Sequence, residues 1–302
     1  MTSDSALSYY GKPIVKEPVW KSEIPRYFFS GGLAGASATL SAAARAAGND
    51  ALARRALYVA ATGVTVSPYL LIKDLGRPLR FYNMMRVFKV TSPMSVGTWI
   101  VAGEGTSTGI AAACELLDVL PRVRASARAF SGLLGPAMAT YTGALVADSV
   151  VPAWHEARHE LPLLFAGSSA AAAGGIAAAL TPVAAARPAR RLGLLGAITE
   201  LVTYRVMEKR LGALVAEPYT KGEGGRYAKA AEAASLAGGA LMLLAGRNRA
   251  GAIAAGALLA AGSWCTRFAV YHAGKASAAD PRYTSIPQRA RATERGQPAV
   301  TR

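Results

Sequence analysis

The sequence predicts an all-α polytopic membrane protein whose eight transmembrane helices form two repeated four-helix bundles. Three observations lead to this prediction: an apolar composition, eight long apolar stretches and an internal repeat. Hydrophobic residues make up 52% of the 302 residues and charged residues only 17%, whereas soluble domains carry about 25% charged residues. A chain with so few charges cannot cover a water-exposed surface of its size.

The chain divides into a polar start, eight apolar stretches and a basic end. Residues 1–23 are polar and lack the apolar region of a cleavable signal peptide, so we expect the first apolar stretch to remain as a membrane anchor. Each stretch is close to the roughly 20 residues that cross the hydrocarbon core of a bilayer. Residues 275–302 are basic and contain three prolines, which predicts an extended tail. The eight expected spans are 24–44, 56–72, 94–117, 129–150, 161–186, 192–208, 230–246 and 250–272.

An internal repeat groups these spans into two sets of four. Two pairs of segments match in order and spacing: Pro18-Val19-Trp20, Glu23-Ile24-Pro25 and Phe28 with Pro152-Ala153-Trp154, Glu160-Leu161-Pro162 and Phe165, and Lys73-Asp74-Leu75-Gly76 with Lys209-Arg210-Leu211-Gly212. The predicted bundles are therefore residues 24–150 and 151–274. Because four is an even number of crossings, both bundles would have the same orientation in the membrane.

The basic residues predict the orientation of the chain. The formal net charge is +16, but the basic residues lie between apolar runs and not in one stripe, so we expect no nucleic-acid partner. Positive charges in short loops mark the cytoplasmic side of a membrane protein. We therefore expect both termini and the longer loops 73–93, 149–160 and 209–229 outside. The short loops, each with two or three arginines, are expected in the cytoplasm: 45–55, 119–128, 187–191 and 247–249.

Metal ligands are scarce in the sequence. The two cysteines, Cys114 and Cys265, form no Cys-x-x-Cys motif, and three histidines cannot supply two axial pairs for haem. We therefore expect no haem, iron–sulfur cluster or metal site in this chain, so that any redox metal belongs to a partner. The spacing of His155 and His159 could hold a metal on a helix, but we favour a loop that contacts a partner.

Three short motifs resemble one known family. They occur in the order Asp74-Leu75-Gly76-Arg77-Pro78, Ser92-Pro93-Met94-Ser95-x-Gly97 and Tyr141-Thr142-Gly143. This series is similar to the NrfD-like family, the polysulfide reductase membrane-subunit class. The resemblance implies a subunit in a prokaryotic inner or plasma membrane that binds menaquinone or ubiquinone. It further implies electron exchange with an iron–sulfur (ferredoxin-like) subunit, which serves a molybdenum-type or cytochrome catalytic subunit.

The resemblance also implies that a residue of the fourth span binds the quinone, and the predicted spans place this residue toward the outer face. In the family a tyrosine of the fourth helix binds a quinone carbonyl, and Tyr141 matches it; the alternative is a structural bond to a neighbouring helix. Asp148 lies two turns further along and either takes a proton from quinol or caps the helix. Asp74 and Arg77 lie in a rigid turn. They form an internal salt bridge, belong to the quinone site, or do both.

Two carboxylates fall near the middle of predicted spans. Glu104 is followed by a polar run, and Glu200 has Thr199, Thr203 and Arg205 nearby. An ionisable side chain at this depth is costly unless it is paired or hydrated, which marks it as a functional candidate. The two residues either transfer protons or, as neutral acids, form hydrogen bonds between helices.

Three functions remain open from the sequence. The leading hypothesis is a quinone-binding subunit that exchanges electrons with an iron–sulfur partner, with or without proton transfer, and does not act on the final substrate. A proton-coupled secondary transporter would also use a doubled bundle with carboxylates in the membrane. A purely structural membrane anchor is the third hypothesis, and bound quinone would separate the first from the other two.

Overall fold

The structure is a computed structural model that describes residues 13–294. In this range every regular element is an α-helix. Eight of the helices have 20 residues or more. The helices are α1 (Glu23–Ala46), α2 (Asp50–Asp74), α3 (Arg80–Met85), α4 (Pro93–Leu116), α5 (Pro121–Ala147), α6 (Pro152–Glu156), α7 (Leu161–Leu180), α8 (Arg187–Thr220), α9 (Gly222–Ala245), α10 (Arg249–Ala279) and α11 (Arg282–Glu294).

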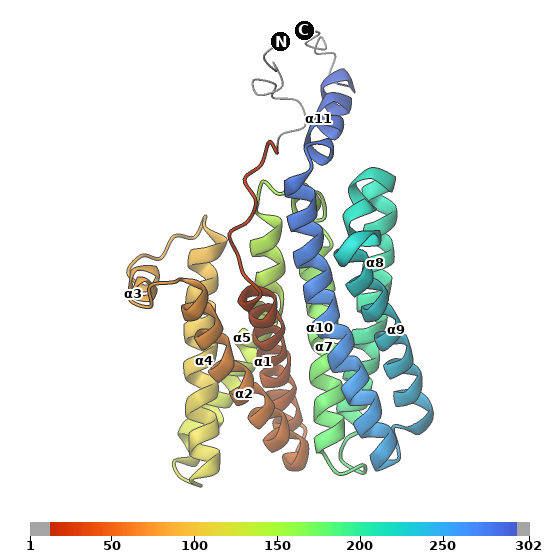
Figure 1. Cartoon of the computed structure of the whole chain (residues 1–302). Helices are drawn as coiled ribbons and strands as arrows, with labels where there is room; N and C mark the ends of the chain where they lie inside the picture. The colour runs from red at the N-terminus through yellow and green to blue at the C-terminus, as the bar shows by residue number, and fades with distance from the viewer. Residues whose placement is uncertain (1–12, 295–302) are drawn as a thin grey trace, which may run out of the picture.

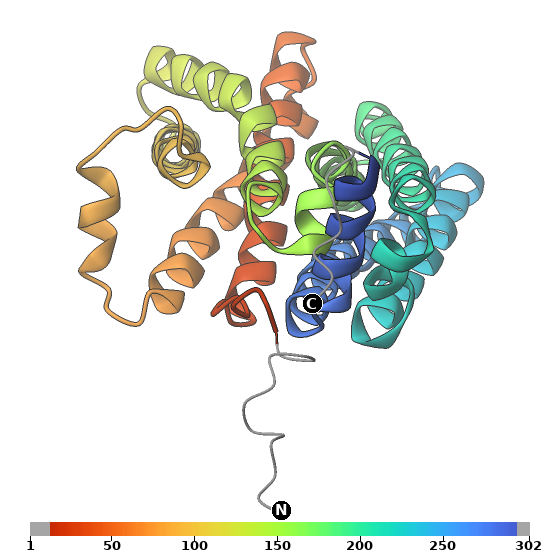
Figure 2. The same cartoon turned by 90° about the horizontal axis from the view of Figure 1, so that it is seen from above.

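The long helices run side by side, and each overlaps one of the predicted spans (Figure 1). We call α1, α2, α4 and α5 the first bundle, and α7 to α10 the second bundle. Seen from above, α1, α5, α7 and α10 occupy the middle, with α4 and α3 at one edge and α8 and α9 at the other (Figure 2). The end that carries α3, α6 and α11 is called the terminal end, and the opposite end the arginine end.

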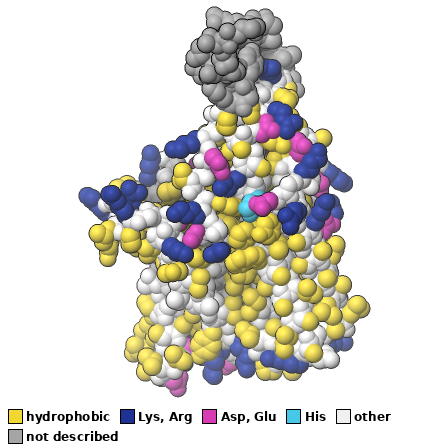
Figure 3. All heavy atoms as spheres, viewed as in Figure 1, with side chains coloured by type: hydrophobic (Ala, Val, Ile, Leu, Met, Phe, Trp, Pro, Cys, Tyr) yellow, Lys and Arg dark blue, Asp and Glu magenta, His cyan; other side chains and the backbone are white. Residues whose placement is uncertain are grey.

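Four helices are both long and apolar enough to cross a membrane: α2, α7, α9 and α10. The other four long helices carry more polar residues, such as Glu104 and Thr108 in α4 or Lys209 and Arg210 in α8. In the face shown in Figure 3, the Lys and Arg side chains gather toward the two ends of the helices. A band between them is nearly free of charge, as expected for a surface that faces lipid.

The two bundles share their cores. One buried cluster joins Phe28 of α1 with Phe165 of α7, and another joins Leu52 of α2 with Leu259 of α10. At the terminal end, the buried Trp154 stacks on Trp20 at 5.4 Å between ring centroids. Its indole nitrogen donates to the carbonyl oxygen of Val270 at 2.7 Å. The halves therefore pack as one unit, because each contributes side chains to the same clusters.

The same local structure recurs in both bundles where the sequence repeats. The carboxylate of Glu23 pairs with the ammonium group of Lys73 at 3.0 Å, and Glu160 pairs with Arg210 at 2.6 Å. Each pair ties the start of one helix to the next helix, just before Gly76 in α2's case and just before the kink at Gly212 in α8's case. Just beyond, Gly76 and Gly212 both adopt left-handed backbone angles, with φ of 68° and 69°, which glycine adopts without a steric penalty.

Two predicted segments differ from the structure. Residues 209–229, predicted as a loop, are helical except near Gly212 and Lys221, because α8 continues past its kink to Thr220. The tail predicted as extended from residue 275 is helical through Glu294. Asp280 accepts a hydrogen bond from the backbone nitrogen of Arg282 at 2.9 Å and so starts α11, which Tyr283 anchors to Glu217 of α8 at 3.1 Å. The last residues of the predicted tail, 295–302, lie outside the described range.

Candidate functional site

A cavity of about 500 Å³ opens inside the first bundle, toward the terminal end. Its wall combines the segment before α1 with residues of all five helices α1 to α5, and most lining side chains are apolar. The polar groups in the wall are few: Tyr27, Asp74, Arg80, Thr98, Thr106 and Tyr141. A largely apolar chamber with a few polar groups is the usual form of a site for an organic ligand.

The Ser-Pro-Met-Ser motif shapes one side of this cavity. Ser92 caps α4 by accepting a hydrogen bond from the backbone nitrogen of Ser95 at 3.4 Å, and Pro93 occupies the first turn, where proline is favoured. The hydroxyl of Ser95 donates to the carbonyl of Val87 and accepts from the backbone nitrogen of Lys89, both at 2.9 Å. These bonds fold the chain back, so that α3 contacts α4 and helps to line the cavity.

The glycine of the same motif makes room for Tyr141. A Cβ atom at Gly97 would lie 2.4 Å from the ring of Tyr141, closer than real Cβ contacts. The phenol of α5 can therefore lie against α4 only because residue 97 has no side chain. Tyr141 lines the cavity, where the sequence analysis expected a ligand-binding residue.

A second phenol in the wall was missed from the sequence. Tyr27 of α1 is only 2% exposed, and its hydroxyl has no hydrogen-bond partner among the described residues. A buried polar group without a partner costs about 1–3 kcal/mol. A ligand that offers an acceptor atom to the Tyr27 hydroxyl would form the missing hydrogen bond. The sequence carried no signal for this role, because a tyrosine at the start of an apolar span is common.

Asp74 lies in the cavity wall, but not in the predicted salt bridge. Its carboxylate accepts from the backbone nitrogen of Lys21 at 3.2 Å, and the described ion pairs do not include one with Arg77. The exposed Arg77 does not line the cavity, whereas Arg80 does. Gly76 has a φ of 68°, and Arg80, the first residue of α3, lines the cavity. Of the alternatives left open for this pair, the Asp74–Arg77 bridge is therefore not found among the described residues.

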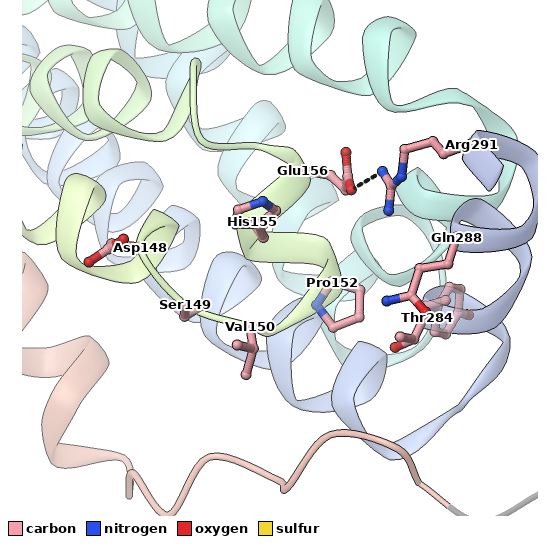
Figure 4. A pocket seen from close by; sticks show the side chains of 10 residues that line it. Asp148, Ser149, Val150, Pro152, His155, Glu156, Thr284, Gln288 and Arg291 are labelled. Atoms are coloured by element: carbon pink, nitrogen blue, oxygen red, sulfur yellow. Dashed lines mark hydrogen bonds and ion pairs between the residues drawn. The ribbon is translucent and has the colours of Figure 1, made fainter. Parts of the chain in front are cut away.

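Asp148 lies apart from Tyr141. The helix α5 ends at Ala147, and Asp148 has non-helical backbone angles (φ −82°, ψ 51°), so the expected two-turn alignment fails. The side chain is exposed and lines a separate cavity of about 480 Å³ between α5, α6 and α11. Figure 4 shows it across from Glu156 and Arg291, which form an ion pair at 2.6 Å.

Both mid-span carboxylates are buried, one in each bundle. Thr108 donates to one oxygen of Glu104 at 2.9 Å, and the other oxygen has no described partner. Glu200 of α8 accepts from Ser235 of α9 at 3.0 Å and from Thr266 of α10. Only about 20 Å³ of free space remains beside Glu200. Glu200 therefore joins α8 to α9 and α10 by hydrogen bonds, as one of the two alternatives expected, whereas the described hydrogen bond of Glu104 stays within α4.

The cation next to Glu200 is not the one that the sequence indicated. Arg205 is exposed and pairs with Glu208 and Glu232. Instead, the fully buried Arg267 of α10 follows Thr266 in the chain. Its guanidinium donates to the carbonyl of Phe165 at 2.9 Å and to the hydroxyl of Ser169 at 2.8 Å, and lies 3.9 Å from the centroid of the Phe165 ring. The sequence did carry a signal for Arg267, because an arginine inside an apolar span is rare and marks a functional candidate.

Comparison with known proteins gives one clear result. No curated protein sequence matches this chain. Residues 14–243 match the family described as polysulphide reductase, NrfD. The match runs from the segment before α1 almost to the end of α9, and so includes every residue of the cavity in the first bundle. The chain therefore belongs to the polysulphide reductase NrfD family and is a multi-pass membrane subunit of a redox complex.

Proposed function

We propose that the chain binds quinol or quinone in the cavity of the first bundle and exchanges electrons with an iron–sulfur subunit. One observation carries the proposal: an apolar cavity of about 500 Å³ has in its wall the buried hydroxyl of Tyr27, which lacks a partner among residues 13–294, and a second phenol, Tyr141. Menaquinone and ubiquinone both combine a flat ring bearing two carbonyl oxygens with an apolar tail. The donor set and the apolar wall fit both parts.

Four polar residues of the wall and its apolar side chains have separate tasks in this proposal. The hydroxyls of Tyr27 and Tyr141 donate hydrogen bonds to carbonyl oxygens and fix the ring. The carboxylate of Asp74 accepts a proton, and the guanidinium of Arg80 favours negative charge on the ring oxygens. The apolar residues of α2 and α4 exclude water and hold the tail. When bound, the quinol supplies two electrons and two protons.

The docking face for the partner is proposed at the terminal end. The segment between α2 and α4 carries several exposed basic and apolar residues: Arg77, Leu79, Tyr82, Val87, Phe88 and Val90. It borders the cavity, and a cluster docked there would lie near the ring. The iron–sulfur subunit in turn serves a molybdenum-type or cytochrome subunit. Crosslinks from residues 77–90 to that subunit are expected, whereas crosslinks confined to the arginine end would contradict this face.

The topology is proposed as eight crossings in two parallel bundles. The eight long helices, the repeated ion pairs Glu23–Lys73 and Glu160–Arg210, and the matching glycines support it. The arginine end then lies in the cytoplasm of a prokaryotic cell. A cysteine placed at residue 188 or 248 should react only with reagents that reach the cytoplasm, and labelling from outside would reverse the orientation.

The proposal includes proton transfer through Glu104 and Glu200. Each carboxylate is buried, and each accepts at least one hydroxyl donor. They do not occupy equivalent positions in the two bundles, since Glu104 belongs to α4 and Glu200 to α8. Reconstituted complex should acidify or alkalinise vesicles during quinol oxidation, and Glu104→Gln should abolish the change if this carboxylate carries the proton.

The direct test of the quinone site is photolabelling. An azidoquinone added to the purified complex should label peptides from the cavity wall, chiefly 94–106 and 141–145, and excess menaquinol or ubiquinol should suppress the label. Label confined to α8 to α10 would place the site in the other bundle. No specific label, together with no co-purified quinone, would favour a structural anchor.

A further inference from the structure

At the arginine end, the two bundles differ in how many of their arginines pair with a carboxylate. In the first bundle four arginines pair with carboxylates: Arg45 with Asp50, Arg54 and Arg128 with Glu115, and Arg124 with Asp118. In the second bundle the sequence has no Asp or Glu in residues 181–199 or 233–279. The described ion pairs accordingly include none with the arginines at this end of α8, α9 and α10.

Four of these arginines surround one cavity. It measures about 500 Å³, lies between the start of α8 and the end of α9, and has seven lining residues: Arg187, Arg190, Arg191, Leu194, Met242, Leu243 and Arg247. Arg190 is half-buried and donates to the carbonyl of Val183 at 3.0 Å, while its stem passes Gly246, where a Cβ would lie 3.1 Å away. The wall thus consists of four cations and three apolar side chains, with no acid.

Four like charges around one space repel one another unless an anion lies between them. Arginine binds phosphate oxygens through two parallel N–H donors, so this wall suits a phosphodiester group. The apolar part of the wall continues along the outside of the bundle, where Leu195, Leu243 and Leu244 are all more than 60% exposed. An anion that also carries an apolar chain would therefore contact both parts.

We propose that this cavity binds the headgroup of an anionic phospholipid from the leaflet at the arginine end. The phosphate lies among Arg187, Arg190, Arg191 and Arg247, and an acyl chain follows Leu194 and Leu243 along α8 and α9. A free phosphate ion shares the headgroup chemistry but has no chain to cover these leucines. The site is remote from the quinone cavity and does not depend on that proposal.

Native mass spectrometry of the full chain in neutral detergent tests this site. Phosphatidylglycerol should be retained, whereas phosphatidylcholine with the same acyl chains should be lost, because its choline would face the arginines. Replacing Arg187 and Arg247 by Gln should weaken phosphatidylglycerol binding about 25-fold, at about fivefold for each arginine removed. The matched control is Arg45→Gln with Arg122→Gln, which removes two charges from the same end of the first bundle and should change binding less than about twofold.

Two further measurements test whether the double variant still folds and whether the ligand is a lipid or free phosphate. Arg187 and Arg247 are exposed and outside the described ion pairs, so the double variant should keep its thermal unfolding midpoint. Leu243→Asn keeps the charge and should still weaken binding of the lipid but not of inorganic phosphate. Equal retention of both lipids, equal loss in both double variants, or full displacement of the lipid by millimolar inorganic phosphate would overturn the proposal.

Discussion

The two bundles each contain four long helices but enclose very different spaces. The first holds an apolar cavity of about 500 Å³ beside Tyr141. The second has only about 20 Å³ beside Glu200, where hydroxyls from α9 and α10 reach the carboxylate. Two bundles with the same number of long helices can therefore differ in their interiors, since one holds a cavity and the other is filled beside its buried carboxylate.

The third long helix of each bundle accounts for the difference. In α9 the buried residues run along the whole helix, from Gly224 to Met242. In α4 all buried residues except Gly97 lie between Glu104 and Cys114, toward the arginine end. The other half of α4 contributes its side chains to the cavity instead, and α3 stands beside it. Close packing of α4 is thus limited to one half of its length.

Removing Arg267 should have the largest effect, because the second bundle is packed around it. Arg267→Met deletes two charge-assisted hydrogen bonds from a fully buried site and should lower the free energy of unfolding by about 3 kcal/mol. Thermal unfolding in detergent measures the change. Arg205→Met is the control, since this exposed arginine should contribute less than about 1 kcal/mol. Equal losses would mean that the second bundle does not depend on its buried cation.

The second-largest effect is expected from a substitution that crowds the cavity of the first bundle. A methyl group at Gly97 would overlap the Tyr141 ring, and overpacking of about 1–3 kcal/mol corresponds to a loss of quinol oxidation of about 5- to 150-fold. Gly109→Ala on the same helix is the matched control, because no atom lies within 4 Å of its Cβ position. Steady-state quinol oxidation by the complex compares the two variants. Normal turnover in Gly97→Ala would place the quinone elsewhere.

Removing a single hydroxyl should have a smaller effect, and only in the first bundle. Tyr141→Phe deletes one hydrogen bond, about 0.5–1.5 kcal/mol, and should slow quinol oxidation about two- to tenfold without unfolding the chain. Tyr204→Phe removes a hydroxyl that donates to the carbonyl of Tyr219 at 3.0 Å, and should lower stability but leave the quinol rate unchanged. Electron transfer from artificial donors to the cluster partner should persist in both variants.

The smallest effect is expected at Asp148. This carboxylate is exposed and lines the other cavity, so Asp148→Asn should alter quinol oxidation by less than about twofold. Asp74→Asn, in the wall of the Tyr141 cavity, should slow the reaction more. If Asp148→Asn instead had the stronger effect, protons would leave through the cavity at α6 and α11.

Much of the architecture was determined by the sequence alone. Apolar stretches of about 20 residues predicted the long helices, because backbone groups in a bilayer must bond within a helix. The repeat predicted that Glu23 and Glu160 occupy matching places, and the family motifs marked Tyr141 and Gly97. These features depend on local sequence and spacing, which a single chain displays directly.

Only the tertiary structure decided which residues share a site. Tyr27 and Arg80 lie 53 residues apart in the chain (positions 27 and 80) but line one cavity, whereas Tyr141 and Asp148 lie close in the chain but line two. The end of α5 at Ala147 separates the latter pair, since helical spacing holds only while the helix continues. The choice of Arg267 over Arg205 as the buried cation has the same origin: burial depends on which face of a helix its neighbours cover.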